Sequence, residues 1–130
     1  MTKIIPSKNP RVIAIQKLYS LYINKDEKLE FKKNRYRGLV KKIVLGTLER
    51  KELIEKLIEQ HLKEDLDIKR TEKLLVIFLH AAIYELLYRP ETSINIIINE
   101  YLNSSVYFLG KKQKKYLNAL LDKISKKIRP

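Results

Sequence analysis

The sequence predicts an all-α protein, a compact bundle of about six to seven helices, because apolar residues recur at three- and four-residue intervals over most of its length. Its composition agrees. Hydrophobic residues make up 45% of the 130 residues, and there are only three glycines and four prolines, which suits a helical chain with a real core. No period of about 20 to 50 residues recurs, so the pattern indicates a bundle and not a solenoid.

The first helix is expected from Pro10 to about Ile23. Asn9 can accept a free amide proton at the helix start, and Pro10 lacks the amide that would be orphaned there. Its apolar positions form a core stripe, Ala14, Leu18, Leu21 and Tyr22, flanked by a row spaced four apart, Arg11, Ile15 and Tyr19.

The charged stretch 24–34 is the expected loop after this helix. Two periodic segments follow, one over about 35–48 and one over about 53–62, each with apolar residues on one side. The pattern leaves open whether these two segments form one bent helix or two separate helices.

The helix expected over 72–87 is apolar around most of its circumference, so it should be the central and most buried one. Asp67 or Thr71 is a candidate cap for its start. Arg89 and Pro90 are expected to end it.

The stretch that begins at Ser93 is ambiguous, because its isoleucine-rich composition favours a strand. Its apolar residues nevertheless share one helical face, Ser93 is a suitable cap and Gly110 a suitable stop. The last helix is then defined by a further apolar stripe, Leu117, Leu120, Leu121, Ile124 and Ile128.

We expect one domain over residues 1–130, in which 1–9 form a flexible basic arm. The chain has no cysteine, which fits a reducing compartment. The N-terminal stretch has no apolar core of a signal peptide, and the longest apolar run is interrupted by His80 and Glu85. These features predict a cytoplasmic protein that does not cross a membrane.

The positive charge is concentrated at the two ends of the chain. The net charge is 28 − 15 = +13; residues 1–37 contribute 10 − 3 = +7, residues 38–110 contribute 10 − 11 = −1, and residues 111–130 contribute 8 − 1 = +7. If the fold brings the ends together, they form one positive face of the kind that binds nucleic acid. The alternative is that the charge serves only solubility.

The start of the last helix sharpens this choice, because four lysines, 111, 112, 114 and 115, precede Tyr116. The helix dipole disfavours cations at that position. Free amides, lysines and an aromatic ring together suggest a phosphate site with a stacking platform. The alternative for Tyr116 is a residue at the boundary of the core.

Other polar residues point to no catalytic or metal site. His61 and His80 are isolated, and no cysteine or carboxylate pair stands at a ligand spacing, so no metal or other cofactor is expected. The three glycines do not form a phosphate-binding loop. Asn99, Glu100 and Asn118 are expected to satisfy buried hydrogen bonds rather than to contact a ligand.

Four motifs resemble the NusB family of bacterial transcription antitermination factors. They are "IQKLYSLY" at 15–22, "IYELLY" at 83–88, "INE" at 98–100 and "YLNALLDKISKKIRP" at 116–130. The resemblance covers about residues 10–23 and 71–130, with the motifs in the family's order. It implies two small helical bundles packed together and no enzymatic activity.

The resemblance also implies partners. Family members bind the boxA segment of ribosomal RNA leaders as single-stranded RNA together with NusE, a small-subunit ribosomal protein, in the RNA polymerase antitermination complex, and they support ribosomal RNA biogenesis. Carried over by position, the RNA-binding residues are Lys8, Arg11, Tyr19, Lys111, Lys112, Lys115 and Tyr116. By elimination and analogy, the protein partner is expected at Tyr84, Leu87, Tyr88 and Thr92.

Two alternatives from other classes remain open. One is an accessory domain of an RNA methyltransferase, a fusion in which NusB-like domains also occur, although a chain ending at Pro130 leaves no room for a catalytic domain. The other is a non-enzymatic interaction scaffold or homodimer that binds no specific RNA.

Overall fold

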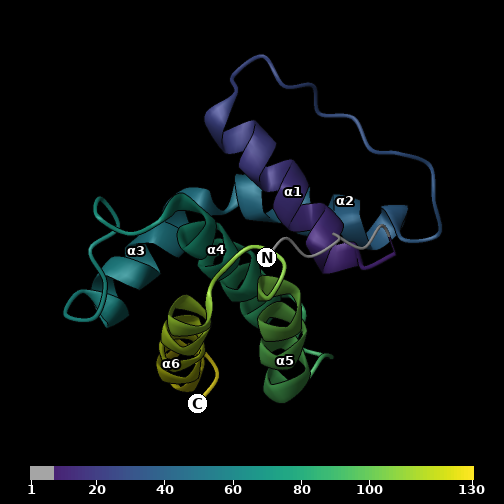
Figure 1. Ribbon diagram of the computed structural model, residues 1–130. Coiled ribbons are helices and arrows are strands. Elements are labelled where there is room, and N and C mark those ends of the chain that lie inside the picture. Colours follow the sequence, from purple (N-terminus) through teal and green to yellow (C-terminus); the bar gives the residue numbers. More distant parts are fainter. Residues whose placement is uncertain (1–7) are drawn as a thin grey trace.

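The computed structural model describes residues 8–130, and over these residues it contains six α-helices and no strand (Figure 1). The all-α prediction is therefore confirmed. The predicted basic arm, 1–9, falls largely on residues 1–7, which lie outside the described residues. The helices are α1 (Pro10–Ile23), α2 (Arg37–Glu49), α3 (Lys51–Leu62), α4 (Lys73–Tyr88), α5 (Ile94–Ser105) and α6 (Lys111–Ile128).

Helix α4 lies at the centre of the fold and contacts each of the other five helices (Figure 1). Its residues from Leu75 to Leu86 are all buried, as its continuous apolar sequence predicts. On one side of α4, α1 packs on α2; on the other, α5 packs on α6, which also contacts α3. The two expected sub-bundles thus share α4 and one continuous core.

The predicted caps of α1 and α5 are confirmed. The Asn9 side chain accepts hydrogen bonds from the amides of Arg11 and Val12, and Pro10 occupies the first helical position. Ser93 Oγ accepts from the amide of Ile96, 3.2 Å away. Periodicity therefore outweighed the strand propensity of the isoleucines in α5.

The segments that could have formed one bent helix are two helices, α2 and α3, separated at Arg50. The backbone of Arg50 leaves the helical region, with φ −104° and ψ 12°. Its carbonyl nevertheless accepts from the amide of Ile54, so the second helix begins at once. The change of direction allows α3 to reach α6, which α2 does not contact.

Three capping predictions were wrong. Asp67 and Thr71 do not cap α4, because the Asp67 carboxylate accepts from the amide of Lys69 and the Thr71 hydroxyl donates to the Asp67 carbonyl, all within the loop. Gly110 does not end α5, which stops at Ser105; it is the residue that precedes α6. Such loop-internal bonds compete with capping.

The chain's last arginine closes the end of α4. The Arg129 guanidinium donates to the carbonyls of Leu86 and Thr92 at 2.6 Å and to that of Arg89 at 2.8 Å. The Leu86 carbonyl lies in the last turn of α4, where Pro90 supplies no amide to it, so the guanidinium satisfies it and opposes the negative end of the helix dipole.

His80 is buried on α4, with its Nδ1 2.9 Å from the hydroxyl of Tyr22. Its Nε2 has no hydrogen-bond partner among the described residues. Burial, assisted by the positive charges of Lys51 and Lys73, lowers the pKa of His80 to about 4. The folded protein therefore holds this imidazole neutral at a pH where an unfolded chain would protonate it.

This pKa predicts a loss of stability on acidification. The unfolded chain binds the extra proton below its ordinary pKa of about 6.5, so the free energy of unfolding should fall by roughly 2 kcal/mol between about pH 7 and about pH 5. His80→Gln should remove this part of the pH dependence in urea unfolding. His61→Gln, at the half-exposed histidine of α3, should leave it unchanged; equal pH dependence in parent and His80→Gln would contradict the prediction.

Candidate nucleic-acid interface

The start of α6 presents a group of unpaired cations. Lys111, Lys112 and Lys115 are exposed, the first turn contains no acidic residue, and none of the three forms an ion pair with a residue between 8 and 130. Gly110 offers no side-chain cap to the first amides. The free amides carry the positive end of the helix dipole and the lysines add full positive charges beside it, so both attract an anion to this helix start.

Tyr116 stands next to these lysines with 37% of its surface exposed. Its hydroxyl donates to the carbonyl of Asp65 in the segment after α3, and the Asp65 carboxylate pairs with Lys123 at 2.5 Å. Partial burial, and then the charge of Asp65, raises the pKa of Tyr116. The ring is thus anchored at its hydroxyl end, and it is neither a free platform nor a core residue.

At the start of α1, Lys8 is exposed, and further along the helix Tyr19 is 37% exposed. The ring of Tyr19 is therefore accessible to a stacking ligand. Ile15, one turn earlier in the same predicted row, is buried. The row therefore passes from the core to the surface along the helix and does not run along an exposed flank.

Arg11 occupies a different place from the one that its predicted RNA contact requires. It is only 8% exposed, and its guanidinium donates two hydrogen bonds to the Glu85 carboxylate, at 3.0 and 2.7 Å. Glu85 itself is fully buried and also accepts from Arg89 at 3.0 Å and from the hydroxyl of Tyr101. The charge of Arg11 is therefore paired, and its Nε and Nη2 donors are bonded, inside the protein.

This buried cluster, Arg11, Glu85, Arg89 and Tyr101, joins three helices, α1, α4 and α5, and the segment after α4. Burial opposes the charged form of Arg11, but the hydrogen bond and charge of Glu85 outweigh it and raise the pKa of the guanidinium. Burial and the Glu85 charge raise the pKa of Tyr101. A buried carboxylate needs such partners, since an unpaired charge in the core is costly.

The two basic ends of the described chain do not touch directly. Helices α1 and α6 make no contact with each other, whereas both contact α4 and α5. The start of α1 reaches α5 through Arg11, which lies over the Tyr101 ring at 5.8 Å. Figure 1 shows that α6 begins at the same end of α5. The two basic starts therefore flank one end of α5, and Tyr116 faces the side of α3.

The outward face of α5 is a feature that the sequence patterns did not predict. Asn95, Asn99 and Asn103 are exposed at a spacing of four, opposite the buried Ile97 and Tyr101. Asn99 and also Asn118, on α6, were expected to satisfy buried hydrogen bonds, and both are exposed. The spacing of the asparagines in the sequence was the available signal, because residues four apart share one face of a helix.

The predicted protein-partner residues differ in accessibility. Tyr84 is buried, Leu87 and Thr92 are partly buried, and Tyr88 is 39% exposed. Tyr88 stacks on Tyr84 with the ring centroids 5.5 Å apart, and the Arg50 guanidinium lies 4.9 Å from the Tyr88 centroid. The accessible part of this surface is thus Tyr88 with Arg50, a residue that the sequence did not suggest.

Gly46 on α2 explains why the Tyr84 ring is buried. A Cβ at this position would overlap the Tyr84 ring, so the missing side chain forms the space in which the ring lies. Helices α2 and α4 can approach closely there. Tyr84 therefore packs against α2, and its ring stacks on that of Tyr88.

None of the helices between residues 8 and 130 combines the length and apolar composition of a membrane span. Within the same residues, no cluster of three or more histidine, aspartate or glutamate side chains could hold a metal ion.

Comparisons with known proteins give consistent similarities. The NusB family model matches residues 8–126. The chain is 31% identical over 87 residues to transcription antitermination protein NusB of Mesorhizobium japonicum, which covers 67% of this chain and 56% of that protein. It is 38% identical over 84 residues to the protein of the same name from Lysinibacillus sphaericus, which covers 65% of each. These matches span less than two thirds of the curated relatives.

The fold is similar to that of T. maritima NusB, with a TM-score of 0.82 at 22% identity, and the superposition covers 100% of this chain and 96% of the other. At this identity the similarity concerns the arrangement of the helices. It supports the all-α assignment and the expectation of packed helical bundles.

Arg11→Met should lower the free energy of unfolding by roughly 3 kcal/mol, because it leaves the buried Glu85 carboxylate with one cation fewer. Arg70→Met is the matched control, since Arg70 forms only an exposed pair with Asp67 at 3.7 Å and its loss should cost less than about 0.5 kcal/mol. Urea unfolding of both variants measures the difference. Equal effects would show that the Arg11 pair is not a structural contact.

Gly46→Ala should destabilise the protein by roughly 1 to 3 kcal/mol, because the new Cβ must displace the Tyr84 ring. Gly38→Ala, also on α2, meets no atom within 4 Å and should stabilise it by roughly 0.5 to 1 kcal/mol through helix propensity. Thermal unfolding compares the two alanines. A stabilising Gly46→Ala would contradict the close packing described here.

Proposed function

This chain belongs to the NusB family, and from that premise we propose that it binds boxA-type single-stranded RNA together with NusE and supports transcription antitermination. The resemblance seen in the motifs is thereby confirmed at the level of the family. The activity is one of binding and assembly: RNA and the ribosomal protein would be held together on one helical domain, in contact with the RNA polymerase antitermination complex, and no reaction is catalysed.

The observation that carries this proposal is the set of free cations at the start of α6. Lys111, Lys112 and Lys115 are exposed and have no acidic partner among the described residues, although a helix start disfavours lysines. The lysines at this position lower the stability of the helix, and a bound anion that neutralises their charge would remove this cost. A phosphate of the RNA backbone supplies that charge and accepts from the free amides.

Bound RNA would extend from α6 across the outward face of α5 toward the start of α1. Lys8 supplies a further charge there and Tyr19 an exposed ring for a base. The exposed asparagines of α5 lie on the helix that separates the two basic starts, and amide side chains read the edges of unpaired bases. Arg11, largely buried and paired with Glu85, supports this surface from within.

The partner protein would bind on a different surface, at the end of α4. Tyr88 and Arg50 are accessible there, with Leu87 beside them and Thr92 held by Arg129. An exposed tyrosine with an arginine on its face is typical of protein interfaces. The middle of the chain has a net charge near zero, which suits a protein partner better than RNA.

The double variant Lys112→Glu/Lys115→Glu tests the proposal. Binding of a boxA-containing single-stranded RNA should be lost, whereas binding of NusE should be retained, as fluorescence anisotropy and calorimetry would show. For the parent, log K should fall with log salt by about 0.7 per phosphate neutralised. Lys56→Glu/Lys69→Glu removes two other exposed lysines and controls for net charge.

Three outcomes would contradict the proposal. If the parent binds no boxA-type RNA with or without NusE, the domain is a scaffold or a homodimer, which sedimentation would distinguish. If both double variants lose RNA equally, only overall charge matters. If the α6 variant loses RNA and NusE together, the two surfaces are not separate.

A further inference from the structure

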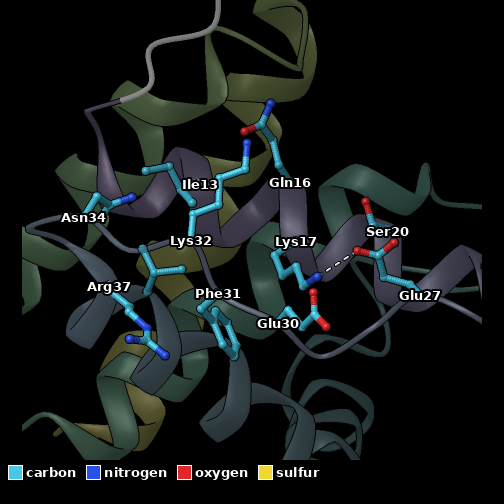
Figure 2. A pocket seen from close by; sticks show the side chains of 11 residues that line it. Ile13, Gln16, Lys17, Ser20, Glu27, Glu30, Phe31, Lys32, Asn34 and Arg37 are labelled. Carbon is cyan, nitrogen blue, oxygen red and sulfur yellow. Dashed lines mark hydrogen bonds and ion pairs between the residues drawn. The ribbon is translucent and has the colours of Figure 1, made fainter.

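A cleft of about 450 Å³ lies between α1 and the segment 24–36 that follows it (Figure 2). This volume is in the range of pockets that hold small ligands of nucleotide size. Its walls include residues of both segments, among them Gln16, Lys17, Phe31, Lys32 and Asn34, and Arg37 at the start of α2. The cleft lies outside every surface used above.

The segment 24–36 contains no helix, yet it is tied to the fold at several points. Lys17 Nζ on α1 pairs with the Glu27 carboxylate at 2.7 Å and donates to the Lys28 carbonyl at 2.5 Å. Phe31 is partly buried against the core, and Asn34 Oδ1 accepts from the amide of Tyr36 at 2.8 Å. Connections of this length are usually disordered or functional, and these contacts argue for the second.

Within the described part of the chain, the cleft contains one paired cation and two unpaired ones. Lys17 is neutralised by Glu27, with Glu30 nearby (Figure 2). Lys32 and Arg37 point to different sides of the cleft, the Lys32 ammonium toward Gln16 and the Arg37 guanidinium toward the side of Phe31, and neither forms an ion pair with a residue between 8 and 130. Each of these two cations can therefore hold a separate phosphate, while Glu27 and Glu30 offer carboxylates to hydroxyl or amino donors.

Groups that can recognise a base line different sides of the cleft (Figure 2). Phe31 contributes an aromatic ring, and Gln16 and Asn34 contribute side-chain amides. The bond of Asn34 to Tyr36 uses only the oxygen, so its amide protons have no partner among residues 8–130. An aromatic ring stacks on a base of any identity, and amides pair with its edge. Ring, amides, cations and carboxylates together match the parts of a nucleotide.

The cleft is also adjacent to the RNA surface proposed above. Gln16 on its rim precedes Tyr19 by three residues on α1, so the two side chains are neighbours on the helix surface. A strand with one base on the exposed Tyr19 ring can therefore place a neighbouring nucleotide at the cleft.

We infer that this cleft binds one unstacked nucleotide of the bound single-stranded RNA, with its base against Phe31 and the two phosphates that flank it at Lys32 and at Arg37. The inference rests on the proposed function, which it extends to a site on the side of α1 away from α6. It makes α1 the middle of the RNA path and not its end.

Lys32→Gln tests the inference against Lys33→Gln, which removes the same charge from the neighbouring exposed residue outside the cleft. The probe is a fluorescein-labelled single-stranded RNA of about 12 nucleotides that contains a boxA element, a length within the range that such sites cover. At about 0.1 M salt, loss of one phosphate contact should weaken binding roughly fivefold and reduce the salt slope by about 0.7. Lys33→Gln should leave both values at the parent's.

A second measurement uses the same RNA with 4-thiouridine in place of uridine. Irradiation of the complex should cross-link the RNA to the peptide that contains Phe31, and mass spectrometry identifies the attachment residue. Arg37→Gln, at the cation on the side of Phe31, should weaken this cross-link. Both variants keep the apolar contacts of the segment, so folding is preserved and can be verified by circular dichroism.

The outcomes separate this inference from the proposed function. Parental affinity for Lys32→Gln, with loss of RNA by the α6 double variant, would overturn the cleft and leave the α6 site intact. If Lys32→Gln and Lys33→Gln weaken RNA binding equally, the effect comes from the overall positive charge of the protein, and the inference of a nucleotide site in the cleft is overturned as well. Absence of RNA binding by the parent would overturn both. A cleft that accepts a protein segment instead would give parental RNA affinity and no cross-link.

Discussion

The buried carboxylate of Glu85 is the constraint on which the arrangement of the other elements depends. Without partners, a charge in the middle of the most apolar helix would cost several kcal/mol, so the fold must bring cations and a hydroxyl to it. Arg11 comes from α1, Arg89 from the end of α4 and Tyr101 from α5. Satisfying one carboxylate thereby fixes how α1 and α5 lie against α4. That geometry places the basic start of α1 at the end of α5 where α6 begins.

The distinction between cations that are paired inside and cations that are free outside follows from this constraint. Arg11 and Arg89 are attached to Glu85, and Arg129 is attached to the carbonyls at the end of α4. The exposed lysines of α6 and the pair Lys32 and Arg37 have no such partners among the described residues. Arginine suits the inner positions because its planar fork satisfies several acceptors at once, whereas lysine acts at the surface as a hydrated point charge. The exposed cations of the candidate interface are therefore mostly lysines, whereas arginines form the internal contacts that hold the helices together.

Tyrosines divide in a similar way. Tyr101 and Tyr84 are buried, one bonded to Glu85 and one lying over Gly46. Tyr19, Tyr88 and Tyr116 keep more than a third of their surface exposed, on three different helices. An aromatic ring with a polar tip can serve either environment, so residue type does not assign the role. Each exposed ring lies beside a different proposed contact: the α1 cleft, the partner surface and the α6 lysines. In the proposed function, the separation of these rings would allow RNA and a protein to be bound at the same time.

The sequence by itself determined the helices, because apolar periodicity and the caps Asn9 and Ser93 are local properties that the chain expresses without its neighbours. It also determined where the positive charge is concentrated and, through four short motifs, the family. Only the tertiary structure decided which cations are available. Arg11 and Lys8 are equally basic in the sequence, and burial against Glu85, 74 residues away, separates their roles. The exposure of Asn99 and Asn118, the break at Arg50 and the cleft under Phe31 depend likewise on contacts between distant segments, which no local pattern encodes.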